Sequence, residues 1–600
     1  MRISVSALLL LAAALAGAAD RHTFVLGKDD FLLDGKPLQI VSGEMHPARI
    51  PPEYWRHRIR MARAMGVNTI AVYVFWNFHE TAEGRFDFAT PDHDIAAFLK
   101  MVQEEGMWVL LRPGPYVCAE WDFGGLPAYL LRVPDLKVRC LDPRYMAAAE
   151  RYIRALARVI APAQVTEGGP ILMLQIENEY GSFGNDRNYL LRLRQVWQEA
   201  GIRVPFYTAD GATTYMLEAG SLPGAAVGLD PGSTDEQFEL ARRMNPGVPV
   251  FSSETYPGWL THWGEPWARR GVDRLIRDVQ GLLDKGRSFN LYVVHGGTNF
   301  GFWAGANSGG KGNYLPDITS YDYDAPITEQ GRATVKYQAL REVLGRHRGT
   351  KGALPEIPAD IPAAAIPPIA LRPYASLWQN LPRPVASVQP RPMEDYGQDF
   401  GMIVYQTTLI GHKSGNLAVT DVHDYATVFV DGRYIGKLDR REGVNTIALP
   451  KTDNPEPVLT ILVEAMGRIN FAQTMIDRKG ITDRVTLNGM TLMNWEVYPL
   501  PLKDDFVRQL PEGKVEERPG IFFLGTFDLA EPADTFLDLS GYQKGLVWVN
   551  GHNLGRYWNL GPQKRLYCPA GWLRRGQNQI LVLDLHQLQP AAVMGFAELQ

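Results

Sequence analysis

The sequence is poor in cysteine, with three residues among 600, at Cys118, Cys140 and Cys568. This odd, small number is not the framework of a disulfide-rich protein, although a single Cys118–Cys140 bridge is compatible with the sequence. CxxC and HExxH motifs are missing, so a structural zinc site or a zincin site has no support. GxxxxGK[ST] and GxSxG are also missing, which removes the usual signatures of P-loop enzymes and serine hydrolases.

The net charge is small, and long apolar runs are few. The 61 basic and 66 acidic residues are interspersed and leave a net charge of −5, so no nucleic-acid partner is expected. The longest apolar run, Val5–Leu15, follows Arg2 and precedes small residues. It is shorter than the ~20 residues that a membrane span needs, and it is typical of a secretory signal peptide. We therefore predict a signal peptide over residues 1–19, a periplasmic or secreted protein, and no membrane span after its removal.

The first 350 residues alternate short apolar strands with helical patterns. Continuously apolar runs such as ILMLQI at 171–176 are typical of strands that are buried on both faces of a parallel sheet. Eight strands are predicted, at residues 38–45, 68–75, 108–113, 171–176, 205–209, 225–229, 248–253 and 289–294. Eight such alternations have the size of a (β/α)8 TIM barrel, with a doubly wound sheet as the alternative.

The rest of the chain is β-rich and repeats itself. Four anchors recur at a constant offset of 119 residues: Gly401 and Gly520, Val428 and Val547, Pro450 and Pro569, and Ile461 and Ile580. We infer two copies of one β-sandwich module, each with a hairpin signal at Asp431-Gly432 or Asn550-Gly551. Carbohydrate binding and simple support of the barrel both stay open as roles for these modules.

Proline marks the join between the two parts. Ten of the 42 prolines fall between Pro355 and Pro392, which predicts an extended connector that lies against the barrel. The predicted domains are therefore the catalytic barrel at 20–350, the proline-rich connector at 351–395, a first β-sandwich at 396–505 and a second, jelly-roll-like β-sandwich at 506–600.

Two of the predicted barrel strands end in carboxylates. Strand 171–176 is followed by Glu177, Asn178 and Glu179, and strand 248–253 is followed by Glu254. The carboxyl ends of barrel strands meet at one mouth, where barrel enzymes carry their chemistry. Two carboxylates across a sugar are what glycoside cleavage requires, one as the acid and one as the nucleophile or base. Because side chains alternate along a strand, Glu177 and Glu179 point to the same face, and spacing alone does not show which of them is catalytic.

Long motifs run in order along the chain. They are GEMHPARIP from Gly43, YVFWNFHE from Tyr73, RPGPYVCAEWDFGGLPAYLL from Arg112, QIENEYG from Gln175, SSETYPGWLTHWG from Ser252, NLYVVHGGTNFGF from Asn290, TSYDYDAPITEQG from Thr319 and VNGHNLGRYW from Val549. A chain with these motifs resembles the β-galactosidases of family 35 of the glycoside hydrolases. The matches extend from Gly43 to about Leu585, which is nearly the whole of the chain after the predicted signal peptide.

The resemblance implies a retaining exo-β-galactosidase that removes terminal non-reducing β-D-galactose from oligosaccharides or glycans. It implies that Glu179 is the acid/base, that Glu254 is the nucleophile, and that Glu177 is a neighbour that orients or pairs. It implies galactose contacts at Tyr73, Cys118, Ala119, Glu120, Asn178, Tyr256, Tyr292 and Tyr323. No metal or other cofactor is expected, because two carboxylates suffice for the mechanism.

The chain departs from the family pattern at a few positions. Pro47 follows His46 where an aromatic residue is common, Val293-Val294 stand where Met-Phe is common, and Tyr129 replaces the usual Trp. These changes affect the rim of the pocket and the acceptor site rather than the two catalytic positions. Two alternatives stay open: an exo-glycosidase of the same fold for another β-sugar, such as a β-glucosaminide, or a catalytically silent carbohydrate-binding protein.

Overall fold

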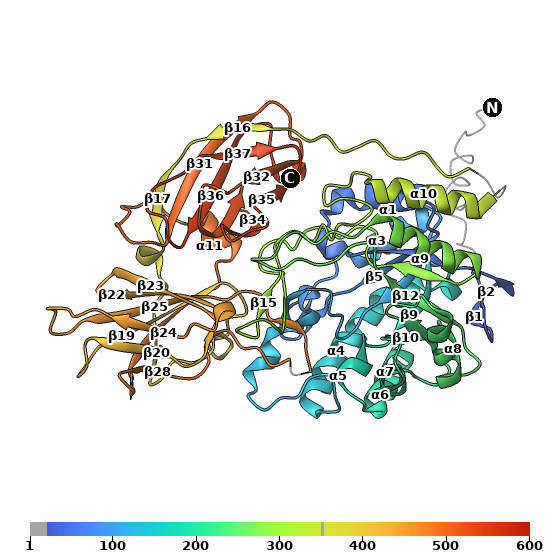
Figure 1. Cartoon of the computed structure of the whole chain (residues 1–600), viewed down its shortest axis with the longest axis horizontal. Coiled ribbons are helices and arrows are strands. Elements are labelled where there is room, and N and C mark those ends of the chain that lie inside the picture. The colour runs from blue at the N-terminus through green and yellow to red at the C-terminus, as the bar shows by residue number, and fades with distance from the viewer. Residues whose placement is uncertain (1–20, 350–352, 474) are drawn as a thin grey trace, which may run out of the picture.

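The computed structural model describes residues 21–349, 353–473 and 475–600, which form a barrel and two β-sandwiches (Figure 1). The predicted signal peptide, residues 1–19, lies outside these described residues. None of the helices in the described ranges combines the length and the apolar character that a bilayer-crossing segment needs.

Eight parallel strands close into a barrel in the order β10-β11-β12-β13-β4-β5-β8-β9. Their bounds are β4 (Val41–Met45), β5 (Thr69–Tyr73), β8 (Trp108–Arg112), β9 (Ile171–Gln175), β10 (Phe206–Asp210), β11 (Ala226–Leu229), β12 (Val250–Thr255) and β13 (Phe289–Leu291). The predicted TIM barrel is therefore confirmed, and the doubly wound alternative is excluded. Nearly every strand residue is buried, because helices cover the outside of the sheet and side chains fill its interior.

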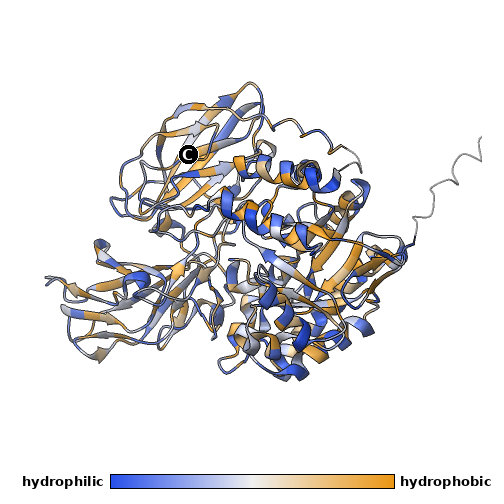
Figure 2. Ribbon diagram, turned by 45° about the vertical axis from the view of Figure 1, so that its right-hand side comes forward, coloured by the Kyte–Doolittle hydropathy of each residue, from blue (hydrophilic) through white to orange (hydrophobic). Residues whose placement is uncertain are grey.

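Helices surround the barrel, with mixed polar and apolar surfaces around the largely apolar strands (Figure 2). The helices are α1 (Trp55–Met65), α2 (Trp76–His79), α3 (Ile95–Glu104), α4 (Pro143–Ile160), α5 (Tyr180–Phe183), α6 (Arg187–Glu199), α7 (Thr214–Gly220), α8 (Asp235–Met244), α9 (Val272–Asp284) and α10 (Val335–Arg348). Local sequence sets their starts. Asp142 caps α4 and is followed by Pro143 in the first turn, while Thr234 and Gln237 form a capping box on α8.

Small sheets complete the barrel domain. They comprise β1 (Phe24–Leu26), β2 (Phe31–Leu33) and β3 (Lys36–Pro37), the pair β6 (Glu80–Ala82) and β7 (Arg85–Phe86), and the pair β14 (Ala306–Asn307) and β15 (Leu315–Pro316). Phe31 of β2 packs edge to face on Phe251 of β12, with 5.7 Å between ring centroids, so the first of these sheets covers an apolar part of the barrel.

The first sandwich packs a six-stranded sheet on a four-stranded sheet. The larger has the order β18 (Val385–Ser387), β30 (Trp495–Leu500), β19 (Met402–Thr408), β25 (Val458–Glu464), β22 (Tyr425–Val430) and β23 (Arg433–Asp439). The smaller has the order β24 (Thr446–Leu449), β20 (Gly415–Val419), β28 (Val485–Leu487) and β29 (Met490–Thr491). β21 (Val422–His423) and β27 (Gly480–Ile481) pair beside them, and β26 (Ile469–Phe471) pairs with β14 of the barrel domain.

Most strands of the second sandwich follow the short helix α11 (Asp504–Arg508), and two precede the first sandwich in the sequence. Its larger sheet has the order β17 (Leu371–Ser376), β31 (Ile521–Leu529), β36 (Gly576–Asp584), β33 (Lys544–Val549) and β34 (His552–Trp558). Its smaller sheet has the order β16 (Ile366–Ile369), β37 (Val593–Phe596), β32 (Thr535–Asp538) and β35 (Arg565–Cys568).

The 119-residue offset corresponds to equivalent strands in the two sandwiches. The run β19-β25-β22-β23 in the first matches β31-β36-β33-β34 in the second, strand by strand and in the same order. Both predicted hairpin turns have positive φ at their two central residues, 50° and 78° at Asp431-Gly432 and 49° and 84° at Asn550-Gly551. Asp, Asn and Gly tolerate this conformation best, and it twists the hairpin to match its strands. The two predicted β-sandwich copies are therefore confirmed.

The proline-rich segment is more than a connector. The described part of it leaves the α10 end of the barrel and crosses to β16 (Figure 1), and the Ala359 carbonyl accepts a hydrogen bond from His57 of α1 at 3.0 Å. β16 and β17 then join the second sandwich, whereas β18 joins the first. Residues 366–376 thus belong structurally to the second sandwich, although the first sandwich lies between them and its other strands in the sequence.

Candidate active site

The carboxyl ends of the barrel strands bring the sequence-predicted residues to one mouth. Tyr73 is the last residue of β5, Asn178 and Glu179 follow β9, Glu254 lies near the end of β12, and Tyr292 follows β13. Hydrogen bonds join five of the strands at this mouth, β4, β5, β8, β9 and β12, and are described below. The predicted positions therefore form one site, at the end of the barrel where such enzymes carry their chemistry.

The loops at this mouth carry unusual backbone conformations. Three consecutive residues, Cys118, Ala119 and Glu120, have φ values of 65°, 59° and 47°, and Glu177 and Glu179 have 59° and 45°. Such left-handed backbone costs non-glycine residues roughly 1 kcal/mol or more each, and it persists where surrounding contacts fix it. Its concentration next to two carboxylates marks these loops as a functional region.

Glu254 is buried and bound to a guanidinium. Its Oε1 accepts a hydrogen bond from Arg112 Nη2 at 2.6 Å and lies 3.5 Å from the hydroxyl of Tyr73. Burial raises the pKa of Glu254, and the positive charge of Arg112 acts in the opposite direction. The guanidinium thus favours the ionised form of a carboxyl that burial alone would keep protonated.

Arg112 is itself held from four sides. Its Nε donates to Gln175 at 2.5 Å, its Nη1 pairs with Glu44, and its Nη2 also donates to Asn178 Oδ1 at 3.0 Å. The guanidinium carbon lies 4.1 Å from the centre of the Tyr73 ring. Sequence reasoning missed the roles of Arg112 and Glu44. The available signal was an arginine closing the apolar strand WVLLR, because a buried charge there requires a partner.

The structure separates the two glutamates that spacing could not. Glu177 accepts hydrogen bonds from Arg139 at 2.9 and 2.7 Å, one on each oxygen, and from Tyr189 at 3.1 Å. This bidentate pairing engages both oxygens of Glu177 with a cation. Glu179 lies in a half-buried position, where the contact to Asn178 Nδ2 is long, at 3.4 Å. Arg139, the partner of Glu177, was also missed from the sequence.

The electrostatics of Glu179 differ from those of an ordinary carboxyl. Burial raises the pKa of Glu179 to about 8, and the negative charge of Glu254 is the next largest cause. At neutral pH, Glu179 therefore holds a proton while Arg112 stabilises negative charge on Glu254. A pair of carboxyls of which one is protonated and the other ionised supplies one acid and one nucleophile or base. Because the two groups interact, they titrate together.

The segment around Glu120 is fixed by contacts from other loops. Tyr321 donates to Glu120 Oε2, and Arg49 Nη2 donates to the Ala119 carbonyl at 2.5 Å. Arg49 also lies over the Tyr321 ring, with its guanidinium carbon 3.7 Å from the ring centre. Burial raises the pKa of Glu120, although the Tyr321 hydroxyl favours its charged form. Sequence reasoning found Glu120 but missed Arg49 and Tyr321.

The predicted tyrosines line the mouth together. The Tyr292 ring centre lies 6.3 Å from that of Tyr73, 6.3 Å from that of Tyr256 and 5.7 Å from that of Tyr323. The Tyr292 hydroxyl also lies 3.0 Å from that of Tyr321. Rings and hydroxyls arranged around two carboxyls suit a ligand that has apolar C–H faces and many hydroxyl groups, as a sugar has.

Cys118 is buried at the same mouth, and its thiol is free, as are those of Cys140 and Cys568. Burial raises the pKa of the Cys118 thiol, so it is protonated at neutral pH. Asn470, in β26 of the first sandwich, donates its side-chain N–H to Cys118 Sγ at 3.5 Å. The first sandwich therefore contributes to the wall of the site.

Comparison with known proteins gives a consistent picture along the chain. Residues 30–347 match the model of the glycosyl hydrolases family 35, residues 390–501 that of the β-galactosidase first all-β domain, and residues 521–578 that of the β-galactosidase galactose-binding domain. A β-galactosidase of Xanthomonas manihotis is 42% identical, with 93% of each chain covered. β-Galactosidase 17 of Arabidopsis thaliana is 39% identical, covering 94% of this chain and 87% of the relative, and a mouse β-galactosidase is 38% identical, covering 94% and 92%.

Proposed function

The chain belongs to family 35 of the glycosyl hydrolases, and we propose that it is a retaining exo-β-galactosidase. It removes terminal non-reducing β-D-galactose from oligosaccharides or glycans. The observation that carries this proposal is the division of labour at the mouth, where Glu179 holds a proton and Glu254 is bound to Arg112. A catalytically silent sugar-binding protein has no need of such a pair, and the named relatives favour galactose over another β-sugar.

In the first step of the proposed mechanism, an oxygen of Glu254 attacks the anomeric carbon of the bound galactose. The bond from that carbon to the leaving oxygen breaks, and its electron pair takes the proton of Glu179. The product is a galactosyl ester of Glu254. Arg112 favours the ionised nucleophile before attack, and Asn178, which accepts from both Arg112 and Tyr73, fixes the geometry between the two strands.

In the second step, water replaces the leaving group. Once Glu254 is an ester its negative charge is gone, and the pKa of Glu179 falls because one cause of its elevation has been removed. Glu179 is then the base that takes a proton from water. The water oxygen attacks the anomeric carbon, and the bond to Glu254 breaks to restore its carboxylate. Two inversions give net retention of configuration.

We further propose that the eight predicted contact positions hold the galactose. The buried Glu120 carboxylate has an oxygen to offer a sugar hydroxyl beside its bond to Tyr321. Asn178 stands next to Glu179. Tyr73, Tyr256, Tyr292 and Tyr323 provide ring faces and hydroxyls, and Cys118 and Ala119 carry Glu120 in its left-handed backbone.

Stereochemistry of azide rescue tests the two catalytic roles. With an activated aryl β-galactoside, Glu179→Ala should still form the glycosyl-enzyme, because a good leaving group needs little protonation. Azide should then release β-galactosyl azide. Glu254→Gly should instead give the α-azide, because only one inversion occurs. If Glu179→Ala yields the α-azide, or if Glu177→Ala shows the acid/base behaviour in its place, the assignment is wrong.

Export to the periplasm or the medium is proposed from residues 1–19 alone, because Arg2, the apolar run and the small residues that follow are typical of a signal peptide. Sequencing the N-terminus of the chain recovered from each cell fraction tests it. We expect a mature chain that begins near Ala19 or Asp20 outside the cytoplasm, whereas a cytoplasmic chain that begins at Met1 would contradict the proposal.

A further inference from the structure

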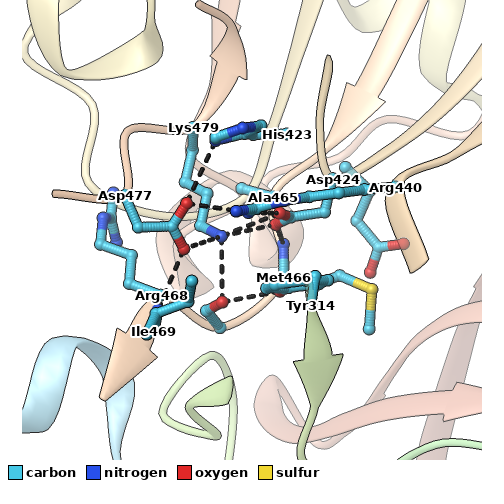
Figure 3. A network of polar contacts seen from close by, with 12 residues as sticks. Tyr314, His423, Asp424, Arg440, Ala465, Met466, Arg468, Ile469, Asp477 and Lys479 are labelled. Atoms are coloured by element: carbon cyan, nitrogen blue, oxygen red, sulfur yellow. Dashed lines mark hydrogen bonds and ion pairs between the residues drawn. The ribbon is translucent and has the colours of Figure 1, made fainter. Parts of the chain in front are cut away.

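A cluster of buried charges lies in the first sandwich, beside its junction with the barrel domain (Figure 3). Lys479 Nζ lies 2.7 Å from Asp424 Oδ2 and 2.9 Å from Asp477 Oδ2, and all three side chains are at most 1% exposed. Arg440 Nη1 donates to the same two carboxylates, at 2.7 and 2.8 Å. Asp424 and Asp477 are thus each paired with both Lys479 and Arg440 in a largely buried region, and we call these four side chains the Lys479 network.

Three residues at the Lys479 network have the spacing of metal ligands, but the ammonium group of Lys479 occupies the position between the carboxylates. Ligand atoms of His423, Asp424 and Asp477 lie within 4.8 Å of one another, a spacing that suits a metal ion. The ammonium group of Lys479 contacts both carboxylates and so supplies the positive charge that a metal ion would supply. Although burial lowers it, hydrogen bonds to Asp421 and Asp477 raise the pKa of His423 to about 9, so its ring is protonated rather than free to bind a metal.

The Lys479 network fixes the backbone that enters β26. The Met466 N–H donates to Asp424 Oδ2 at 2.8 Å, and the Ile469 N–H donates to Asp477 Oδ2 at 3.0 Å. The Gly467 carbonyl accepts from Lys479 Nζ at 3.0 Å. Because buried backbone groups need partners, these charged side chains determine the path of residues 466–469.

Residues 468–470 in turn form hydrogen bonds with the loop that carries Glu120. The Arg468 N–H donates to Asp122 Oδ1 at 2.7 Å, and the Tyr116 hydroxyl donates to the Asn470 carbonyl at 2.5 Å. The Asn470 side chain donates to Cys118 Sγ. These contacts stand on both sides of residues 118–120, the stretch with three consecutive left-handed residues.

A loop of the barrel domain, which includes Gly305 and Tyr314, contacts both residues 466–470 and the Glu120 loop. The Tyr314 hydroxyl donates to the Gly467 carbonyl at 2.6 Å, and the Gly305 N–H donates to the Glu120 carbonyl at 2.9 Å. A side chain at Gly467 would bring its Cβ within 2.2 Å of the Ala304 carbonyl oxygen, so the two backbones meet without space between them. Displacement of residues 466–470 therefore moves the Glu120 loop as well.

From this chain of contacts we propose that Lys479, with Asp424 and Asp477, is a positioning residue for galactose binding, although it lies in another domain and touches no sugar. The inference deepens the proposed function, because it takes the mouth to be a galactose site. The left-handed stretch at 118–120 persists only while its neighbours fix it, and the Lys479 network is one part of the support that the first sandwich supplies, beside the ion pair of Arg468 with Asp122. The first sandwich is thereby a component of the binding site and not only a scaffold.

The test compares Lys479→Met, which removes the charge, with Lys479→Arg, which keeps it. Lys479→Met should raise both the KM for p-nitrophenyl β-galactoside and the inhibition constant of galactose at least tenfold, with kcat changed less than threefold. Misplacement of a binding group by about 1 Å is enough for such a loss. Lys479→Arg should recover most of the affinity.

Asp534→Asn is the matched control for general destabilisation. Asp534 is a buried carboxylate that accepts hydrogen bonds from Tyr54 at 2.6 Å and from Tyr567 at 2.5 Å, at the junction between the barrel and the second sandwich. None of its hydrogen bonds in the described part of the chain involves residues 466–470. Its replacement should lower the thermal midpoint, as Lys479→Met does, but should leave KM within twofold of the wild type.

Hydrogen exchange separates this inference from the proposed function. In Lys479→Met, the amides of residues 116–124 should exchange at least tenfold faster than in the wild type, and in Asp534→Asn they should not. This readout holds whichever sugar the enzyme accepts. Unchanged exchange and an unchanged KM in Lys479→Met, or an equal rise of KM in Asp534→Asn, would overturn the inference. Should Lys479→Met fail to fold, Tyr314→Phe removes a single hydrogen bond to Gly467 and should show the same changes at smaller size.

Discussion

Replacing Glu254 with Gln should lower the pKa of Glu179. Burial raises the pKa of Glu179 from 4.5 to about 8, and the negative charge of Glu254 is the next largest cause. Glutamine keeps the size of glutamate but removes its charge. The effect of burial therefore stays in the variant while the repulsion by Glu254 disappears, so the elevation that remains is the one that burial causes.

The size of the change follows from Coulomb's law. The carboxyls of a retaining pair stand about 5.5 Å apart. At an effective dielectric constant of about 20, two unit charges at that separation repel by roughly 3 kcal/mol. Arg112, at 2.6 Å from Glu254, offsets part of that charge. We therefore expect about half of the repulsion, or ~1.5 kcal/mol, which takes the pKa of Glu179 from about 8 to about 7.

The measurement is a ¹³C NMR titration of protein labelled at its glutamate carboxyls, with the Glu179 signal assigned by its loss in Glu179→Gln. In the wild type, the basic limb of the kcat/KM profile should give a matching value near 8, because the free enzyme must hold that proton. Glu329→Gln is the control. Glu329 is also buried and accepts hydrogen bonds from Thr298 and Ser320, and its loss should leave the pKa of Glu179 unchanged.

Two results would refute the reasoning. A wild-type Glu179 that titrates near 4.5 would mean that the site does not keep its proton at neutral pH. A Glu179 that stays near 8 in Glu254→Gln would mean that the two carboxyls are electrostatically independent, and the fall in pKa between the two proposed steps would then have no cause.

Three further outcomes are expected. Hydrolysis of a β-galactoside should survive exhaustive treatment with EDTA, because two carboxylates carry the mechanism; activity that is lost and then restored by one particular metal would count against this. A chain ending at Gly349 should be insoluble or inactive, because it bares the surface that the sandwiches cover, and a soluble fragment with full activity would contradict the expectation. Protonated His423 should add about 3 kcal/mol to the free energy of unfolding below its unfolded pKa of about 6.5, and this is lost as the pH rises through about 9. In urea unfolding, the deficit of His423→Gln should thus be largest near pH 6 and nearly absent at pH 9.5, and a deficit that grows with pH would disprove the role.

Sequence pattern predicted the elements whose signal is local. Apolar runs located every barrel strand to within three residues at each end, because a strand buried on both faces is mostly apolar. The repeated Asp-Gly and Asn-Gly turns located both sandwiches. The placement of β16, β17 and β18 could not be predicted, because an edge strand pairs with a partner that is remote in sequence, and its own residues do not specify that partner.

The same distinction holds for the site. Glu177, Glu179 and Glu254 stand out because they lie at or just after the ends of apolar strands, and the resemblance to family 35 singled out Glu179 from Glu177. The difference between Glu177 and Glu179 depends on Arg139, which is 38 residues away from Glu177 and reaches it only in the folded chain. Asn470 was beyond prediction for the same reason, since it reaches the barrel mouth from another domain.

The placement of β16 and β17 has a consequence for synthesis of the chain. They leave the ribosome before the whole first sandwich, and β31, the partner of β17, begins 145 residues after β17 ends. At about 5–20 residues per second, β17 waits roughly 7 to 30 s for that partner. During the wait, the nascent chain completes β19, the counterpart of β31 in the first copy. β17 is thus available to pair with the free edge of β19 before β30, the native partner of that edge, has been synthesised. Correct folding therefore requires that β30 and not β17 pairs with β19.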